Sequence, residues 1–421
     1  IRRPPRSTQS RSSAASDVYK RQAIFLLPFI VMRVFKPIIR DVFKISDLDI
    51  GEAQALYGVT ALISYFFGGF IADKWEARKL LSISLIITSI GGVIMVSIPS
   101  IISFKILYAL WGVSTIFLFW AALIKATRLW GNKNNQGVSF GLLDGGRGLF
   151  AASIALFGAS ILSYFFPDGA VVVSYADKKI TLQYILGAIT GIVFLIGLFV
   201  WFSLPDESFE KSKEKENFSL KQVIELIKKP KIIYHSLLIM SAYTGYKLTG
   251  VFGIYAKDVW GFSIENATYF AVFIQFIRPL TVIFVGWIAD KLTPSLVVIP
   301  CFTFITIASI LIGLGDFEKK YFAVSFGLFI LIAIGTYSLR GLYFALIEEV
   351  RAPIKITGTL VGIISIVGFT PDIFMSLFTG YILGKDPGVE EYQHLFTMFS
   401  IFPILGLIAA FFFRKSRINW N

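Results

Sequence analysis

The sequence has very few of the side chains that bind metals or form disulfides. It contains one cysteine, Cys301, and two histidines, His235 and His394, among 421 residues. A single thiol excludes a disulfide framework, and two distant histidines cannot supply a zinc site. We therefore expect no metal and no cofactor, and we assign these three residues to packing or to the surface.

Charged residues are also scarce. They make up 16% of the chain, whereas soluble domains contain about a quarter, and 55% of the residues are hydrophobic. Most of the chain therefore cannot face water, which indicates an integral membrane protein. Glycine and proline occur throughout the apolar runs, which favours packed helices over the alternating strands of a β-barrel. In this context the formal net charge of +13 does not indicate a nucleic acid partner.

Apolar runs long enough to cross a bilayer recur along the chain. A spanning helix needs about 20 mostly apolar residues. Such runs occur at 52–72, 80–98, 101–124, 138–165, 182–204, 232–256, 262–289, 295–315, 321–347, 356–384 and 395–413. Residues 23–39 supply part of one more, which we expect to be truncated because the apolar run before Arg33 is short. The predicted fold class is an all-α integral membrane protein with twelve transmembrane helices.

The ends and the middle of the chain differ from these runs. Residues 1–22 are rich in arginine and serine, lack an initiator methionine and resemble translated adapter sequence, so we treat them as non-native rather than as a targeting arm. Residues 205–231 form a charged stretch, either a solvated linker or a short amphipathic helix on the membrane surface. We predict an N-terminal half at 23–204, a C-terminal half at 232–414 and a tail at 415–421.

Lysine and arginine are distributed unequally between the predicted loops. About twice as many lie on the side of the central loop as on the other side, and basic loops stay in the cytoplasm. We therefore predict a multi-pass protein of a bacterial inner membrane, with both termini in the cytoplasm.

Two short sequences occur once in each half. "GFIADK" at 69–74 corresponds to "GWIADK" at 286–291, and "ALIKATR" at 122–128 corresponds to "ALIEEVR" at 345–351. Each pair occupies the same position in the order of helices. The sequence therefore predicts two parallel repeats of six helices.

Over residues 23–414 the chain resembles the major facilitator superfamily. The loop after the second helix of that family reads G-x-x-x-D-x-x-G-R-[KR]; the corresponding residues here are Gly69, Asp73, Arg78 and Lys79, with one additional residue between Asp73 and Arg78. Ala77 stands where the family has glycine. The resemblance implies two pseudo-symmetric six-helix bundles and a secondary transporter that works by alternating access.

The same loop predicts a conformational latch, meaning charges that hold one state together and separate in another. Asp73 ends a helix, whose dipole would repel it unless Arg78 and Lys79 paired with it. Ordinary anchoring by basic residues is the alternative. The predicted latch residues are Gly69, Asp73, Arg78, Lys79, Gly286, Asp290 and Lys291.

Several charges fall near the middle of the predicted helices, where each costs roughly 3 kcal/mol or more. The basic residues are Arg33, Arg147, Lys247, Arg278 and Arg340, and the acidic residues are Asp372 and, about a turn shallower, Asp144. This positive excess favours an anionic substrate, phosphorylated or carboxylated. Arg33 and Lys247 lie at equivalent places in the two halves, which partly resembles the organophosphate:phosphate antiporters. Alternatively, Asp144 pairs with Arg147 one turn away, and Asp372 neutralises another base.

Asp372 follows Pro371, which would bend its helix. This carboxylate could carry a proton during symport, or it could form a salt bridge to Arg278 or Arg340. Four uncharged side chains at cavity depth complete the candidate substrate site, with packing as the alternative reading: Tyr243, Tyr246, Gln275 and Tyr337.

The sequence therefore predicts a transporter rather than an enzyme, since no nucleophile–base pair, metal cluster or cofactor motif is present. The alternatives are a proton symporter for neutral sugars or nucleosides and a transporter-like membrane sensor. The expected partners are a small-molecule substrate, a coupling proton or counter-anion, and the lipid bilayer. We expect a monomer.

Overall fold

The computed structural model describes residues 21–45, 47–130, 135–165, 174–203, 225–262, 264–315, 317, 321–352, 356–384 and 387–416. Within these ranges the chain forms helices and turns and no strand, which confirms the all-α prediction. Most of the predicted linker at 205–231 and of the tail at 415–421 lies outside the described residues, as does nearly all of the segment 1–22.

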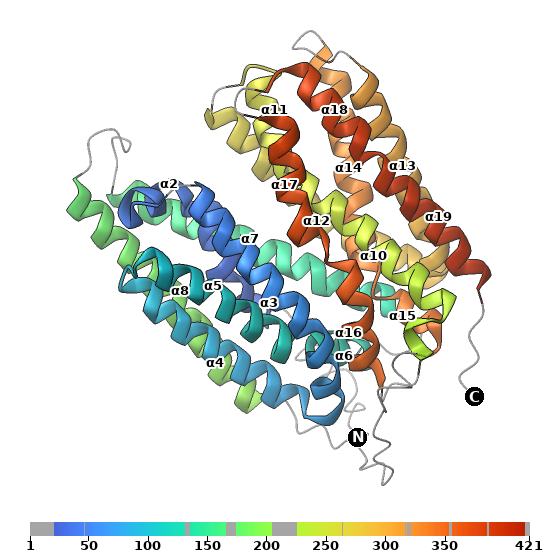
Figure 1. The fold of residues 1–421 in the computed structure, drawn as a ribbon, viewed down its shortest axis with the longest axis horizontal. Coiled ribbons are helices and arrows are strands. Elements are labelled where there is room, and N and C mark those ends of the chain that lie inside the picture. The colour runs from blue at the N-terminus through green and yellow to red at the C-terminus, as the bar shows by residue number, and fades with distance from the viewer. Residues whose placement is uncertain are drawn as a thin grey trace, which may run out of the picture. The chain divides into compact units, whose positions relative to one another are not determined.

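Helices occur at each of the twelve predicted positions (Figure 1). Those of the first half are η1 (Arg21–Phe25), η2 (Leu26–Ile30), α2 (Val31–Phe43), α3 (Asp47–Lys74), α4 (Ala77–Val96), α5 (Ile101–Val113), η3 (Ser114–Trp120), α6 (Ala121–Trp130), α7 (Gln136–Phe165) and α8 (Tyr175–Ser203). Those of the second half are α10 (Pro230–Leu248), η5 (Thr249–Val251), α11 (Phe252–Asp258), α12 (Ile264–Lys291), α13 (Pro294–Leu314), α14 (Phe322–Leu342), α15 (Leu346–Val350), α16 (Thr357–Gly368), α17 (Pro371–Leu383), α18 (Val389–Phe399) and α19 (Ile401–Lys415).

Many of these helices are suited to a bilayer. In the described part of the chain, 8 are long and apolar enough to cross a membrane, and 9 are if the bent pair Asp49–Tyr65 and Phe67–Lys74 is one span. Several predicted spans consist of two or three shorter helices. A helix can break inside a bundle because neighbouring helices satisfy the freed backbone groups.

The chain divides into two compact units. Unit 1 comprises residues 1–130, 149–213 and 355–362, and unit 2 comprises residues 131–148, 214–354 and 363–421. Both α7 and α16 therefore begin in one unit and continue into the other. The units differ from the predicted halves by these two exchanged helix ends.

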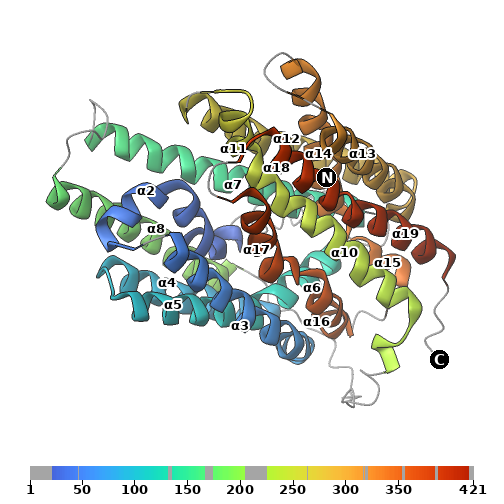
Figure 2. The same cartoon turned by 45° about the horizontal axis from the view of Figure 1, so that its top comes forward.

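Small side chains position the helices of unit 1. The helices α3 and α5 lie side by side, as do α4 and α8 (Figures 1 and 2). A Cβ atom on Gly112 of α5 would meet the carbonyl oxygen of Tyr57 at 2.5 Å, so this glycine permits the close approach to α3. Between α4 and α8, the Ser82 hydroxyl donates to the carbonyl of Gly197 at 2.7 Å. Such contacts between small residues are typical of packed membrane helices.

A cluster of aromatic side chains packs in one part of unit 2. The ring of Trp260 is fully buried and packs edge-on against Phe329 and Phe322, with centroid distances of 5.5 and 4.9 Å. Tyr255 packs edge-on against Trp260 at 5.4 Å, and the indole nitrogen of Trp260 donates to Ser325 at 2.9 Å. This cluster joins the end of α11 to α14 and leaves the polar residues of α10, α12 and α14 elsewhere in the unit.

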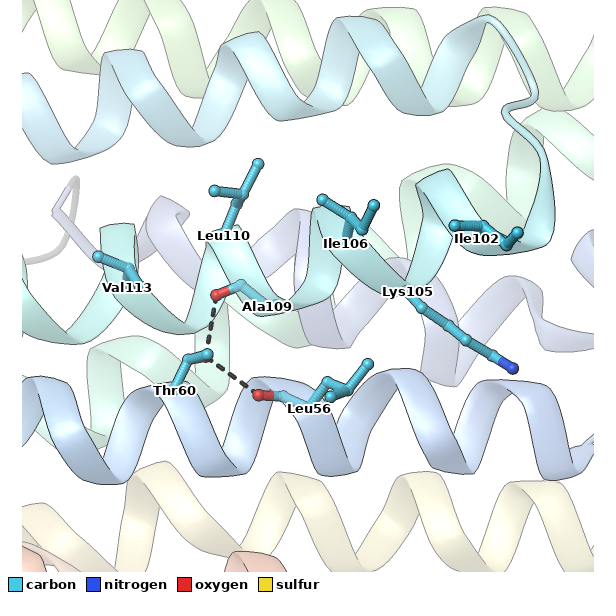
Figure 3. Close-up of a pocket in the computed structure, with 8 residues that line it drawn as sticks. All are labelled: Leu56, Thr60, Ile102, Lys105, Ile106, Ala109, Leu110 and Val113. Atoms are coloured by element: carbon cyan, nitrogen blue, oxygen red, sulfur yellow. Dashed lines mark hydrogen bonds between the residues drawn. The ribbon is translucent and has the colours of Figure 1, made fainter.

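A shallow apolar groove of about 460 Å³ runs between α3 and α5 of unit 1 (Figure 3). Its lining residues are Leu56, Thr60, Ile102, Lys105, Ile106, Ala109, Leu110 and Val113. Thr60 turns its hydroxyl to the carbonyls of Ala109 and Leu56, so the groove offers hydrocarbon at its centre. Lys105 pairs with Glu52 and with Asp49 at 3.5 Å. This chemistry fits a surface that faces lipid, and none of the predicted substrate residues lines it.

The replacement Gly112→Ala should destabilise unit 1, because the new methyl group meets backbone atoms that cannot move aside. We expect a loss of about 1–3 kcal/mol, seen as a lower Tm of the purified protein in detergent. The control is Gly187→Ala in α8, where a Cβ atom would meet nothing within 4 Å. That variant should be neutral or slightly stabilising. Equal Tm values for the two variants would contradict the proposed close approach of α5 to α3.

Candidate functional site

Glycines on α7 bring its polar residues against α12. The segment "GLLDGGRG" covers residues 141–148, and a Cβ atom on Gly145 would lie 2.9 Å from Val282 and 3.5 Å from Pro279. One on Gly148 would lie 3.3 Å from the side chain of Arg278. The glycines thus allow the backbone of α7 to approach α12 closely, and Asp144, next to Gly145, reaches Arg278 directly.

Asp144 and Arg278 form a buried bidentate ion pair. The Nε of Arg278 donates to Oδ2 of Asp144 at 2.8 Å, and its Nη2 donates to Oδ1 at 2.5 Å. The two residues are only 5% and 3% exposed. A planar guanidinium that meets both oxygens of a carboxylate is the strongest such geometry, and it compensates for removing both charges from water.

Two further arginines lie near the same carboxylate at longer range. The Nε of Arg340 donates to Oδ1 of Asp144 at 3.4 Å, and Nη1 of Arg147 lies 3.9 Å from that atom. The predicted pairing of Asp144 with Arg147 is therefore secondary to its pairing with Arg278, because the fork of Arg278 already occupies both oxygens. Nη1 of Arg340 is buried and has no hydrogen-bond partner among the described residues.

Tyrosines from α10 and α14 surround the arginines. The guanidinium carbon of Arg340 lies 3.8 Å from the ring centroid of Tyr246 and 5.4 Å from that of Tyr243. Arg278 lies 5.5 Å from Tyr246 and 5.9 Å from Tyr337. The electron-rich faces of these rings attract the cations without neutralising them. The aromatic residues thus orient the arginines while the positive charge remains.

Asp372 forms a second polar centre with α10. Its Oδ1 accepts from the Tyr243 hydroxyl at 2.9 Å and from Nζ of Lys247 at 3.0 Å. The predicted alternative of a salt bridge from Asp372 to Arg278 or Arg340 is therefore wrong. Lys247 is one turn from Tyr243 on α10, which faces the start of α17, and the arginines are already held by Asp144 and the tyrosines.

Unit 2 therefore contains one polar network, whose two centres are linked by Tyr243: its hydroxyl donates to Asp372, and its ring centroid lies 5.4 Å from the guanidinium carbon of Arg340. Its charged members are Arg147, Lys247, Arg278, Arg340, Asp144 and Asp372. The cations exceed the carboxylates, and the network joins α7, α10, α12, α14 and α17 of this unit. Such an excess of positive charge among apolar helices can attract an anion.

Of the other predicted substrate residues, Tyr337 and Gln275 lie in unit 2 and Arg33 lies in unit 1. Tyr337 is fully buried beside Arg278, and Gln275 is half-buried on α12. Arg33 lies on α2 of unit 1, but its side chain is outside the described part of the chain. The structure therefore brings together the predicted charges of α7, α10, α12, α14 and α17.

The aspartates of the two repeated loops both cap the first turn of another helix. In unit 1 the carboxylate of Asp73 accepts from the backbone nitrogens of Gly358 and Thr359 at 2.8 and 2.7 Å, and from the Thr359 hydroxyl at 2.7 Å. Nζ of Lys125 lies 3.6 Å away. These contacts neutralise Asp73 through the N-terminus of α16, whose exposed N–H groups attract anions.

Asp290 makes the equivalent contacts in unit 2. It accepts from the backbone nitrogens of Gly137 and Val138 at 2.6 and 2.9 Å, at the N-terminus of α7. Gly286 makes room for this approach, since a Cβ atom there would lie 2.5 Å from the carbonyl oxygen of Gly137. Lys291 instead lies 3.5 Å from the ring centroid of Trp287. The second repeat thus keeps the cap although it lacks most of the basic residues.

The predicted partners of Asp73 were wrong. Arg78 and Lys79 both lie beside Glu76, at 3.7 and 3.2 Å. Arg78 and Lys79 are close to Asp73 in sequence. The actual donors are backbone N–H groups in the first turn of a distant helix, which have no partner within that helix. Lys125 is also part of the cap, and the repeated "ALIKATR" segment was the signal that could have indicated it.

The family follows from a match over most of the chain. Residues 22–374 match the family model described as Major Facilitator Superfamily. The chain belongs to the Major Facilitator Superfamily. The protein is therefore a multi-pass membrane transporter that works by alternating access, as the signature loop and the repeats predicted.

Relatives and solved structures agree with this assignment. The chain is 29% identical to the inner membrane protein YqcE of Escherichia coli, with 87% of this chain and 86% of the relative covered. It is 24% identical to the inner membrane protein YihN of the same organism, with 92% and 91% covered. Both relatives are named inner membrane proteins, which agrees with a multi-pass membrane protein.

Solved transporters share the fold at low sequence identity. The structure of FucP in the outward conformation has a TM-score of 0.76 at 13% identity and covers 96% of this chain and 98% of that chain. The proton:xylose symporter XylE bound to 6-bromo-6-deoxy-D-glucose has a TM-score of 0.71 at 13% identity, with 97% and 96% covered. A bacterial homologue of the human lysosomal transporter Spinster has a TM-score of 0.62 at 15% identity, with 98% and 100% covered.

The cap on α16 should contribute measurably to stability. Asp73→Ala leaves two backbone N–H groups without an acceptor, which costs about 1–3 kcal/mol for each group that stays buried. We expect a clear fall in Tm in detergent, and a smaller fall for Asp73→Asn because the amide oxygen still accepts one hydrogen bond. An unchanged Tm for Asp73→Ala would show that the cap does not hold this helix end in unit 1.

Proposed function

We propose that this transporter moves a small organic anion, phosphorylated or carboxylated. The observation that carries the proposal is the buried Nη1 of Arg340, which has no hydrogen-bond partner among the described residues and belongs to a network with surplus positive charge. A guanidinium offers paired donors that match carboxylate and phosphate oxygens. An anionic substrate would therefore supply both the missing acceptor and the missing charge.

Electrostatics supports this choice of substrate. A buried polar group without a partner costs about 1–3 kcal/mol, more when it is charged, so such a group persists where a function uses it. The nearby rings of Tyr243 and Tyr246 give the arginine a fixed orientation without occupying its remaining donor. The organic part of the substrate would contact these aromatic faces while its anionic group meets Arg340.

Removing this charge should impair transport of anions. We expect Arg340→Gln to lower kcat/KM for anion uptake into proteoliposomes at least ~10-fold, because a charge-assisted hydrogen bond is worth about 1.5–3 kcal/mol. The panel comprises glycerol phosphate, glucose phosphate, succinate and lactate, with glucose and xylose as neutral solutes. The matched control is Arg414→Gln, which removes an exposed arginine of α19 and should change uptake by less than about twofold.

One result of this assay would overturn the proposal. If the wild-type protein moves only the neutral sugars, and Arg340→Gln leaves that transport intact, the substrate is not an anion.

A proton symporter for neutral solutes is the second candidate. FucP is described as a fucose:proton symporter and XylE as a proton:xylose symporter, and both share this fold. In this chain the tyrosines of α10 and the carboxylate of Asp372 are the features that favour such a function. Uptake of the neutral members of the same panel distinguishes the two candidates.

We also propose that Asp372 couples transport to protons. Its side chain is 20% exposed and is held by a lysine and a tyrosine, so protonation would remove the charge that pairs with the lysine and weaken the hydrogen bond from the tyrosine. Asp372→Asn should abolish accumulation driven by a pH gradient but retain exchange of substrate across the membrane. The matched control is Asp258→Asn, whose carboxylate also accepts from a tyrosine, Tyr392, at 2.9 Å.

Exchange and accumulation that are lost together would contradict a specific role of Asp372 in coupling. They would instead indicate that the contacts with Lys247 and Tyr243 are needed for every step of transport.

The last proposals concern the movement of the two halves and the contacts that hold one state. We propose that the halves 23–204 and 232–414 rock about the central site as a monomer, with both termini in the cytoplasm. The caps made by Asp73 and Asp290 would then act as the latch, since a helix end that leaves its cap loses two or more hydrogen bonds at once.

A further inference from the structure

The three arginines around Asp144 are not equivalent. Arg278 engages both oxygens of the carboxylate, at 2.8 and 2.5 Å. Arg340 and Arg147 approach the same oxygen only at 3.4 and 3.9 Å. Because Coulomb attraction and hydrogen-bond strength both fall with distance, Asp144 is chiefly the partner of Arg278.

The contacts of Arg340 do not use all of its hydrogen-bond donors. Its Nε points toward Asp144, and the face of its guanidinium lies on the ring of Tyr246 at 3.8 Å. Its Nη1 is buried without a partner among the described residues. Arg340 is therefore held in place by Asp144 and by the rings of Tyr246 and Tyr243, and these contacts leave its Nη1 donor unused.

We propose that Asp144 is an internal competitor for the anion site, and that Arg278 is the positioning residue that limits this competition. Arg278 binds the Asp144 carboxylate at both oxygens and so keeps it from pairing closely with Arg340. The anionic group of the substrate then binds to Arg340, while Arg278 does not contact the substrate. This inference rests on the proposed function, because it assigns separate roles to residues of the same site.

The distances give a physical reason for this division of roles. A guanidinium that already binds both oxygens of a carboxylate has little remaining attraction for a second anion. If Arg278 lost its charge, the nearest cations to Asp144 would be Arg340 and Arg147, and a small rotation of the side chain would bring the carboxylate into full contact with them. The substrate would then have to displace an anion that belongs to the protein.

The decisive experiment compares one single variant with one double variant. Uptake of glycerol phosphate and of succinate is measured in proteoliposomes, and KM and kcat are determined separately. We expect Arg278→Gln to raise KM roughly 10-fold or more, because Asp144 now occupies Arg340. Adding Asp144→Asn to that variant removes the competing charge and should return KM to within about threefold of the wild-type value.

Two further variants test the inference. One keeps an ion pair with Asp144, and the other removes only the charge of Asp144. Arg278→Lys preserves a cation for Asp144 and should leave KM close to the wild-type value. Asp144→Asn alone should lower KM, and it should also lower kcat if tighter binding slows release of the anion. A purely structural role of the pair would instead lower the amount of folded protein and kcat, with no fall in KM.

The outcomes separate this inference from the proposed function. If wild-type protein transports the anions but the single and double variants have the same raised KM, Arg278 binds the substrate directly and the inference is wrong. The inference is also wrong if Asp144→Asn raises KM while the protein remains folded. If the wild-type protein transports neither anion and moves only neutral sugars, the proposed function itself fails.

Discussion

Charge buried among apolar helices has to be compensated, and the arrangement of unit 2 depends on this requirement. Asp144 is almost fully buried, and it is stable there because Arg278 binds both of its oxygens. That pairing requires α7 to lie very close to α12, which the glycines around Asp144 permit. Arg147, one turn along α7, and Arg340, on α14, lie near the same carboxylate, so this ion pair is at the centre of the network.

In the two repeated loops, a carboxylate likewise compensates for polar groups that lack a partner, here at the start of a helix. The first turn of a helix has N–H groups without a partner in the helix, and a carboxylate satisfies them. Asp73 does this for α16 in unit 1, and Asp290 does it for α7 in unit 2. Glycine accompanies each contact, because Gly69 lies against the carbonyl of Gly358 and Gly286 lies against that of Gly137. The two repeats therefore share an interaction between an aspartate and a helix end, although the second loop has no counterparts of Arg78 and Lys79.

Family membership and substrate specificity are determined by different parts of this chain. The signature loops, the repeats and the match to the Major Facilitator Superfamily concern the transport machinery. Solved members with the same fold include sugar symporters and a Spinster homologue, so the fold by itself is compatible with chemically different solutes. Specificity for a solute must come from the residues at the site. In this chain the proposed site contains arginines, a lysine and tyrosines, with fewer carboxylates than cations.

The sequence by itself determined the membrane class, the number and order of the helices, the duplication and the residues that carry charge within the helices. These properties follow from local composition and from repeats, so they can be read without knowing which helices touch. Only the tertiary structure decided the pairing. It placed Asp372 against Lys247 instead of Arg278 or Arg340, and Asp73 against the start of α16 instead of Arg78 and Lys79. The physical reason is that partners of buried charges come from helices far apart in sequence and include backbone N–H groups, which no pattern of side chains reveals.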